Sequence, residues 1–160
     1  MRCVGVDIAK AGLSAVALAV DGEPRQARAW KPSNPRDSEP TQLLEWEQWL
    51  RARFWAYKPD IIVVEQLAVF LNKKTIRVLS HFEGIALKEA KRYGAIVVNP
   101  MIGSSRNIVL GIAANSNKET AMEVGAGYFR GFDFGRDAGR GDKMDAMVHA
   151  MAGPTHLERK

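Results

Sequence analysis

Cysteine is nearly absent from this chain: Cys3 is its single cysteine among 160 residues, so no internal disulfide can form. A lone cysteine suits a reducing compartment. Long apolar runs are also missing. The longest, residues 15–20, has the length of a strand, whereas a membrane-spanning helix needs about 20 apolar residues. Asp7 interrupts the apolar N-terminus, so no secretory signal is expected. We therefore expect a cytoplasmic or other intracellular protein without a membrane partner.

Several enzyme signatures are missing too. The sequence contains no Gly-x-x-x-x-Gly-Lys-[Ser/Thr] run, which excludes a P-loop ATPase. The three histidines do not have the spacing of zinc ligands, and Cys3 has no neighbouring base in the sequence. Zinc chemistry and cysteine nucleophilic catalysis are therefore not indicated.

The bulk composition is that of an ordinary globular domain, with 46% hydrophobic and 26% charged residues. The length is sufficient for one domain with a full core, so residues 1–160 are predicted to form a single domain. The formal net charge of +5 indicates an acidic partner.

The order of apolar segments predicts a mixed sheet covered by helices. Residues 3–8, 14–20 and 25–30 are read as strands, and the turn sequences between them predict an antiparallel meander. Residues 31–40, with three prolines, are read as an exposed loop. Thr41 is the expected cap of a helix that ends near Tyr57, whose aromatic residues are assigned to core or rim packing. Further strands are expected at 60–65 and 95–98, and further helices at 74–93, 102–110, 118–129 and 142–151. The predicted fold is α/β, with three antiparallel strands followed by two parallel ones.

Four acidic residues stand where a carboxylate adds little stability. Asp7 and Glu65 each end an apolar strand, and Asp142 and Asp145 open an apolar helix. Desolvating a carboxylate costs several kcal/mol unless it is paired. Capping and the helix dipole are an alternative explanation for the two helical acids, worth about 0.5–1 kcal/mol each. Capping does not explain the two strand-terminal acids.

Converging carboxylates would repel one another, and a pair of hard cations would remove the conflict. Magnesium prefers oxygen ligands, and two such ions about 3.5–4 Å apart activate a water and stabilise the leaving oxygen of a phosphodiester. The four acids therefore predict a Mg²⁺ site, with Mn²⁺ as a possible substitute and two ions per site.

Most of the excess charge lies on one predicted helix. Residues 71–92 contain six basic and two acidic residues, and at about 100° per residue the basic ones share a face. This face is either an ordinary solvated surface or a surface that meets phosphates or a second subunit, with Gly84 allowing close approach of another backbone. The positions on this face are Lys73, Lys74, Arg77, His81, Gly84, Lys88 and Lys91.

The order of these motifs resembles that of RuvC-type Holliday junction resolvases, within the RNase H-like (retroviral integrase) superfamily, which includes viral and phage members. The resemblance rests on residues 4–8 around Asp7, on Val63-Val64-Glu65-Gln66, and on Asp142-Lys143-Met144-Asp145-Ala146. Residues 81–86 and 106–112, with Lys118 seven residues after Gly111, extend it over nearly the whole chain. Three departures are Ala9-Lys10-Ala11-Gly12 in place of the common Pro-Gly, one extra residue before Lys118, and a glycine- and arginine-rich segment at 130–141.

This resemblance implies a metal-dependent endodeoxyribonuclease that acts as a homodimer on branched DNA, especially four-way junctions, and nicks two strands symmetrically. It implies that Asp7, Glu65, Asp142 and Asp145 bind the metal and that Lys118 lies near the scissile phosphate. Phe70 is the candidate for an aromatic that probes the junction centre. The proposed DNA contacts are Phe70, Lys73, Lys74, Arg77 and Arg106.

Three other functions stay open at this point. The first is a broader branched-DNA nuclease. The second is the catalytic domain of a DEDD-type transposase, whose opening resembles residues 5–10, although such proteins continue into a further domain. The third is a catalytically silent nucleic-acid-binding protein on the same fold, which retention of all four acids disfavours. A sugar kinase or actin-like ATPase would need a chain long enough for two lobes.

Overall fold

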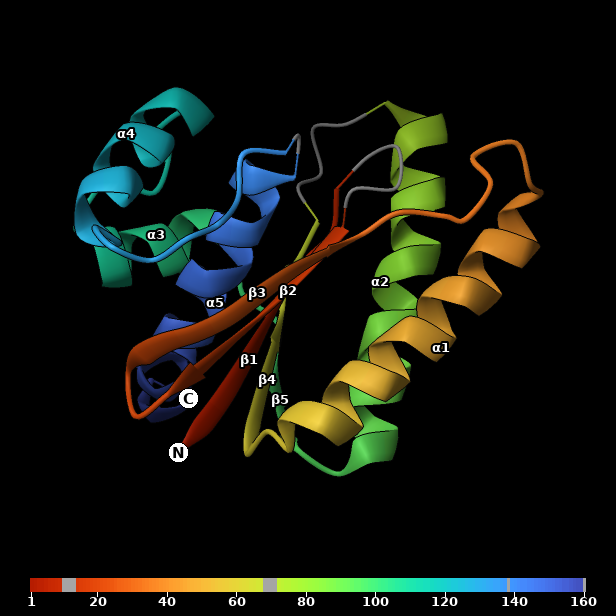
Figure 1. The fold of residues 1–160 in the computed structure, drawn as a ribbon, viewed down its shortest axis with the longest axis horizontal. Helices are drawn as coiled ribbons and strands as arrows, with labels where there is room; N and C mark the ends of the chain where they lie inside the picture. Colours follow the sequence, from red (N-terminus) through yellow and green to blue (C-terminus); the bar gives the residue numbers. More distant parts are fainter. Residues whose placement is uncertain (10–13, 68–71, 138, 160) are drawn as a thin grey trace.

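A five-stranded mixed sheet forms the centre of the molecule (Figure 1). The computed structural model describes residues 1–9, 14–67, 72–137 and 139–159. The strand order is β3-β2-β1-β4-β5: β1 is antiparallel to β2 and parallel to β4, β3 is antiparallel to β2, and β5 is parallel to β4. The predicted fold, three antiparallel strands followed by two parallel ones, is confirmed. The strands are β1 (Arg2–Asp7), β2 (Ser14–Val20), β3 (Glu23–Trp30), β4 (Ile61–Val64) and β5 (Ile96–Val98).

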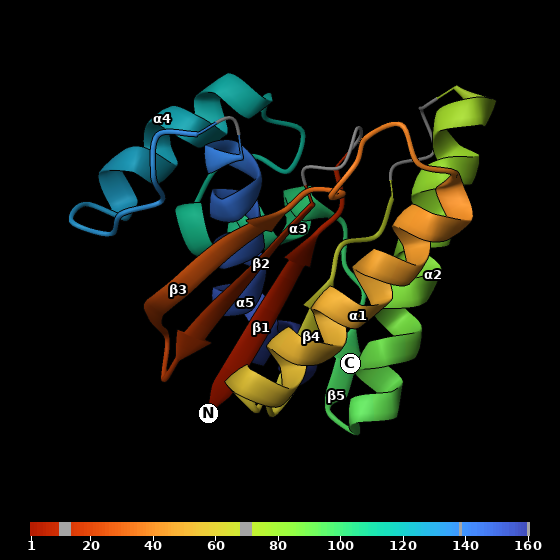
Figure 2. The same cartoon turned by 45° about the vertical axis from the view of Figure 1, so that its right-hand side comes forward.

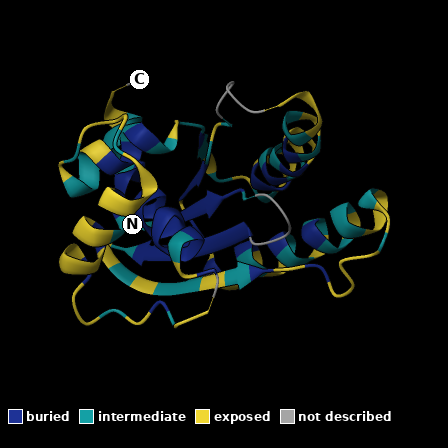
Figure 3. Ribbon diagram, turned by 90° about the horizontal axis from the view of Figure 1, so that it is seen from above, coloured by how far each residue is buried: buried dark blue, intermediate teal, exposed yellow. Residues whose placement is uncertain are grey.

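Helices cover both faces of this sheet (Figures 1 and 2). On one face α1 (Glu39–Tyr57) and α2 (Lys73–Tyr93) pack against each other. On the other face α5 (Arg140–Glu158) crosses the strands and contacts α3 (Ile102–Leu110) and α4 (Lys118–Tyr128). Among the described residues, no helix has the length and apolar character that crossing a membrane requires. Figure 3 shows the central strands buried between these layers.

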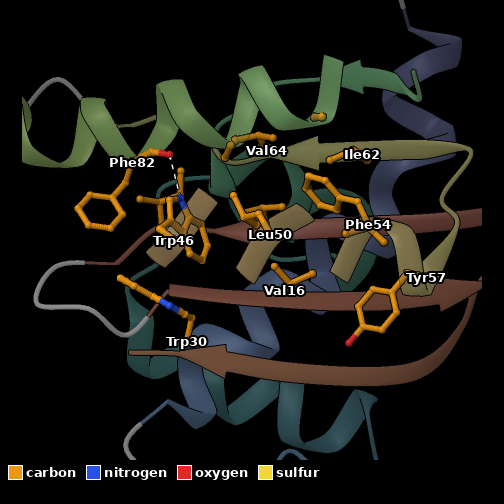
Figure 4. Packing of buried hydrophobic residues seen from close by; sticks show 14 of the residues in the cluster. Val16, Trp30, Trp46, Leu50, Phe54, Tyr57, Ile62, Val64 and Phe82 are labelled. Atoms are coloured by element: carbon orange, nitrogen blue, oxygen red, sulfur yellow. Dashed lines mark hydrogen bonds between the residues drawn. The ribbon is translucent and has the colours of Figure 1, made fainter. Parts of the chain in front are cut away.

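The larger core lies between the sheet and the α1–α2 pair (Figure 4). Trp46, Leu50 and Phe54 recur along one face of α1 and are fully buried there, as their helical spacing predicts. The Trp46 indole donates a hydrogen bond of 3.1 Å to the Phe82 carbonyl of α2, which satisfies its one polar atom inside the core. Trp55 lies at the rim rather than in the core: its side chain is 67% exposed and packs edge-on against Tyr93, with ring centroids 5.6 Å apart.

Small residues line the opposite face of the sheet. Ala15, Ala17 and Ala19 alternate along β2 toward α5, and Gly5 holds the corresponding place on β1. A Cβ atom at Gly5 would lie 1.9 Å from the Ala146 carbonyl oxygen, a separation that real atoms do not reach. The absence of a side chain therefore lets α5 lie directly on β1, which fixes where the acids of α5 fall.

The boundaries of α1 and α5 differ from the predictions. α1 begins at Glu39, with Ser38 at the N-cap and Pro40 in its first turn, so Thr41 is not the cap. Proline fits the first turn because its missing N–H would have no helical partner there. α5 continues past Met151 to Glu158 and includes Pro154. Packing extends the helix beyond its breaker, since the adjacent Gly153 lies against Val63 and Ile61 of β4.

Candidate active site

The two strand-terminal acids lie side by side at the carboxyl ends of parallel neighbours. Val6 of β1 is paired with Val64 of β4, so Asp7 and Glu65 follow at the same level. The Glu65 N–H donates to the Val6 carbonyl at 3.0 Å, and the Ile8 N–H donates to Glu65 Oε2 at 3.2 Å. Strand alternation turns Gly5 and Asp7 toward α5 and the valines toward α1 and α2. The first pair of acids therefore faces the helix that carries the second.

Asp142 and Asp145 lie in the first and second turns of α5, and both are buried. Gly139 holds the N-cap position, so the alternative in which Asp142 caps the helix is wrong. The helix dipole still favours negative charge at this end. The dipole cannot account for the burial of Asp145 one turn further along.

The pKa values show that the four carboxylates share one neighbourhood. The pKa of Asp7 is raised well above its usual value, first by burial and then by Glu65, Asp145 and Asp142. Burial also raises the pKa of Glu65; the hydrogen bond from Asp7 and the Ile8 N–H act in the opposite direction. Crowded carboxylates hold a proton when no cation neutralises them. We refer to Asp7, Glu65, Asp142 and Asp145 as the acidic centre.

Arg106 of α3 is an internal cation of the acidic centre. Its Nε and Nη2 atoms donate to Asp145 Oδ1 at 3.1 and 3.0 Å, and Nη2 also donates to Oδ2 at 2.8 Å. The two side chains are only 9% and 6% exposed. Arg106 was predicted to bind DNA, and that role stays a prediction. In this structure the guanidinium is directed at a carboxylate inside the molecule.

Lys118, at the start of α4, is the second cation. Its Nζ lies 2.7 Å from Asp142 Oδ1, yet the side chain is 56% exposed. Burial by itself would lower the pKa of Lys118, but the hydrogen bond to Asp142 and the charges of Asp145 and Asp7 outweigh burial and raise it. Gly141 leaves room for this contact, because a Cβ there would lie 3.1 Å from Lys118 Cε. The predicted catalytic lysine is therefore placed at the acidic centre.

The donor chemistry of the acidic centre fits a hard divalent cation. All four ligand candidates are carboxylates, and the raised pKa of Asp7 reflects uncompensated negative charge. As the side chains stand, no three acidic, histidine or cysteine groups within the described ranges are arranged to hold an ion. Two of the four acids are occupied by the protein's own cations, since Arg106 engages both oxygens of Asp145 and Lys118 engages Asp142. A divalent ion would replace Lys118 as the partner of Asp142 most easily, because the Lys118 side chain can move into solvent.

A buried polar contact that the sequence analysis missed fixes α3 against α5. The Ser105 hydroxyl lies 2.9 Å from His149 Nδ1 and 2.9 Å from His156 Nε2. Ser105 precedes Arg106, so the contact fixes the helix that carries the guanidinium. The sequence does contain a signal for it: the two histidines are seven residues apart, two helical turns on one face of α5.

The predicted DNA-binding residues of α2 lie on an exposed face. Lys73, Lys74 and Arg77 are exposed and form no ion pair with any described residue. Lys88 is instead paired with Glu47 of α1 at 3.0 Å, and His81 with Glu39. Lys73, Lys74 and Arg77 therefore place three free charges at the N-terminal end of α2, while Lys91 is exposed in its last turn. Phe70 lies outside the described residues.

The strand order, the flanking helices and the position of the acids define an RNase H-like fold of the RuvC type. The chain is similar in structure to RuvC of Thermus thermophilus, with a TM-score of 0.74 and 16% identity over 95% of each chain. It is also similar to T. thermophilus RuvC in complex with a Holliday junction substrate, with a TM-score of 0.78 and 15% identity over 99% of this chain and 96% of that one.

A third solved structure shares the fold at greater distance. The crystal structure of the yeast mitochondrial Holliday junction resolvase has a TM-score of 0.62 and 10% identity, over 98% of this chain and 80% of that one. No family model and no curated protein matches the sequence. The predicted resemblance to RuvC-type resolvases is therefore confirmed at the level of the fold.

Proposed function

We propose that this protein is a metal-dependent, structure-selective DNA endonuclease that resolves four-way junctions by paired symmetric nicks. The observation that carries the proposal is the meeting of four carboxylates, from β1, β4 and α5, on a RuvC-type fold. A catalytically silent binding protein would have no use for this arrangement, since crowded acids destabilise a fold that does not bind a cation.

The acidic centre supplies the ligands for Mg²⁺ or Mn²⁺. A bound divalent cation would activate water and stabilise charge on the phosphodiester. Asp7 and Glu65 are fixed by the sheet, whereas Asp142 is fixed by α5 and held by Lys118. Because Lys118 is half exposed and beside the acids, its ammonium group is suited to contact a phosphate oxygen of the strand being cut.

DNA recognition is assigned to the basic residues of α2. Lys73, Lys74 and Arg77 are exposed near one end of the helix and would contact phosphates without regard to sequence. Phe70 precedes them in the chain and remains the candidate for an aromatic contact at the junction centre. Cutting two opposed strands requires two active sites, so a homodimer is part of this proposal.

A broader branched-DNA nuclease is the second candidate. Arg130 and Arg136, between α4 and α5, and Arg140, the first residue of α5, are at exposed positions. Phosphate contacts from these arginines do not depend on base sequence and would favour binding to many branched substrates.

One cleavage assay separates these functions. Labelled four-way junction, flap, linear duplex and RNA–DNA hybrid are each incubated with the protein, with and without Mg²⁺. We expect Mg²⁺-dependent cutting at symmetric positions in the junction and little cutting of linear duplex. Cutting of flap and junction at equal rates would favour the broader nuclease, and no cutting of any substrate would contradict both.

The Asp7→Asn variant tests the site itself. We expect cleavage to fall by at least about 100-fold, because a metal ligand is lost, while junction binding is retained. Gel mobility in Ca²⁺ measures binding and a quench-flow assay measures cutting. Glu123→Gln, at an exposed position of α4, serves as the control for loss of an acid elsewhere. Full cleavage by Asp7→Asn would remove Asp7 from the site.

A further inference from the structure

The acidic centre is already half neutralised by the protein's own side chains. Two of its four carboxylates are paired with cations, Asp145 with Arg106 and Asp142 with Lys118. With all four acids ionised and both cations in contact, the net charge of this group is −2. An ion that binds Asp142 displaces Lys118, so one divalent cation then leaves −1 and a second leaves +1. Charge balance alone does not set the number of ions, and the ligands that remain free decide it.

The two internal cations differ in how firmly they are held. Arg106 makes three hydrogen bonds to Asp145, and both side chains are buried. Lys118 makes one contact to Asp142 and reaches solvent. A planar guanidinium that grips both oxygens of a carboxylate is a stronger and more directional partner than an ammonium group. An incoming ion therefore displaces Lys118 rather than Arg106.

The backbone under Arg106 is also fixed. Ser105 is hydrogen bonded to two histidines of α5, and Gly103 fits tightly against the chain that follows α3, where a Cβ would lie 2.1 Å from the Ala114 carbonyl oxygen. α3 therefore cannot rotate or slide to withdraw the guanidinium without breaking buried contacts. Arg106 behaves as a resident part of the acidic centre.

We propose that Arg106 takes the place of the second divalent cation, so that the DNA-free protein binds one ion per chain. The ligands left for that ion are Asp7 and Glu65, together with Asp142 once Lys118 moves away. This inference rests on the proposed function only in that the acidic centre binds a divalent cation. It replaces the expectation of two ions, which came from the four acids without their partners.

Mn²⁺ binding to the intact, DNA-free protein tests the stoichiometry. Electron paramagnetic resonance of free Mn²⁺ and isothermal titration calorimetry are applied to wild type, Arg106→Met and Arg106→Lys. We expect one ion per chain for wild type and for Arg106→Lys, which keeps the charge. Arg106→Met should bind two ions per chain, because Asp145 is then an unpaired ligand.

The melting temperature gives a second readout that does not depend on activity. Arg106→Met should melt lower than wild type in EDTA and recover most of the difference in Mn²⁺. Arg51→Met is the matched control, because Arg51 pairs with Glu89, a carboxylate only 2% exposed that lies outside the acidic centre. Mn²⁺ should not restore the melting temperature that Arg51→Met loses. The double variant Arg106→Met with Asp145→Asn removes the pair together and should return the stoichiometry to one.

The outcomes distinguish this inference from the proposed function. Two ions bound by wild type, with Asp7→Asn losing binding, would overturn the role of Arg106 and leave the metal-dependent nuclease intact. One ion bound by both wild type and Arg106→Met, with equal gains in melting temperature, would also overturn it. If wild type binds no ion and melts identically in EDTA and Mn²⁺, the proposed metal site itself is wrong.

Discussion

At the scale of single residues, His149 shows how burial changes the chemistry of a side chain. It is fully buried in α5, and burial, followed by the charges of His156 and Arg106, lowers its pKa to about 3. The pKa of His156 is lowered as well, first by burial. Both histidines share the Ser105 hydroxyl, which has one proton to donate, so the imidazole that accepts it has to be neutral.

This burial predicts a loss of stability in mild acid. The folded pKa of His149 lies below the unfolded value of 6.5, so the unfolded chain binds the proton first. The stabilisation is complete above pH 6.5 and declines as the pH falls, by about 1.4 kcal/mol per pH unit for one group. Urea unfolding at pH 7.5, 6.5 and 5.5 measures it. His149→Gln should show a smaller decline than wild type, whereas His81→Gln, at an exposed position, should not.

The raised pKa of Asp7 predicts the opposite dependence of stability on pH. Its folded pKa is raised, so its contribution to stability is present below about its unfolded value of 3.8 and is lost as the pH rises through the folded pKa. Without metal, burial and the neighbouring carboxylates oppose ionisation of Asp7 as the pH rises. We expect Asp7→Asn to be more stable than wild type in EDTA by about 1–3 kcal/mol, which is roughly 2–4 °C in melting temperature per kcal/mol.

Calorimetry in EDTA and then in Mg²⁺ checks this expectation. Addition of Mg²⁺ should raise the melting temperature of wild type and leave that of Asp7→Asn nearly unchanged. A lower melting temperature for Asp7→Asn in EDTA would mean that Asp7 supports the fold through contacts other than those with the acidic centre.

At the scale of elements, the position of α5 decides whether a site exists. Gly5 and the alanines of β2 let the helix approach the sheet, and Asp142 and Asp145 then reach the neighbourhood of Asp7. A methyl group at Gly5 would meet the backbone of α5 rather than a movable side chain. The helix and the strand must therefore separate to accept it.

Gly5→Ala should be strongly destabilising as a consequence. We expect a loss of about 3 kcal/mol or more, because overpacking against backbone cannot relax through a rotamer change. Gly127→Ala in α4 is the control: nothing lies within 4 Å of its Cβ, and alanine in a helix should add about 0.5–1 kcal/mol. Chemical denaturation measures both. A loss below about 1 kcal/mol for Gly5→Ala would show that α5 does not rest on β1 as described.

Much of this arrangement was predictable from the sequence. Alternation and helical spacing are local, so the strands, the sheet class and the buried face of α1 followed from the residue pattern. The strand-terminal acids followed from the same logic. The pairing of Arg106 with Asp145 did not, because 39 residues separate them and no periodic pattern links α3 to α5. The extension of α5 past Pro154 was missed because packing against β4 overrides a local breaker.

At the scale of the whole molecule, the charge distribution separates the acidic centre from the surface that would meet DNA. Asp7, Asp142 and Asp145 are buried and Glu65 is half-buried, while Lys73, Lys74 and Arg77 stay exposed on α2. Arg106 and Lys118 neutralise the acids in part. Lys88 contributes less to this surface than its spacing suggested, because it pairs with Glu47. The basic surface formed by Lys73, Lys74 and Arg77 is smaller than the face that helical spacing predicted, and it lies at the start of α2.

Reversing two of these charges tests the role of that surface. Lys73→Glu with Arg77→Glu should weaken junction binding by about 10-fold or more at low salt and reduce the salt dependence, because phosphate contacts are lost. Lys31→Glu with Arg36→Glu is the matched control, with the same change in net charge at exposed positions after β3. Fluorescence anisotropy at several salt concentrations measures binding, and sedimentation velocity follows the oligomeric state.

The comparison of the two double variants separates three roles of the α2 surface. Weaker binding by the α2 variant alone, with an unchanged sedimentation coefficient, is the expected result and assigns the surface to DNA. Dissociation of a dimer in the α2 variant would assign the surface to a second subunit, because charge reversal breaks contacts between these basic residues and acidic groups of a partner. Equal losses in the two variants would reflect net charge only, because long-range attraction to DNA depends on the total charge as well as on contacts. In that case the surface is an ordinary solvated helix face, and junction selectivity has to come from residues outside α2.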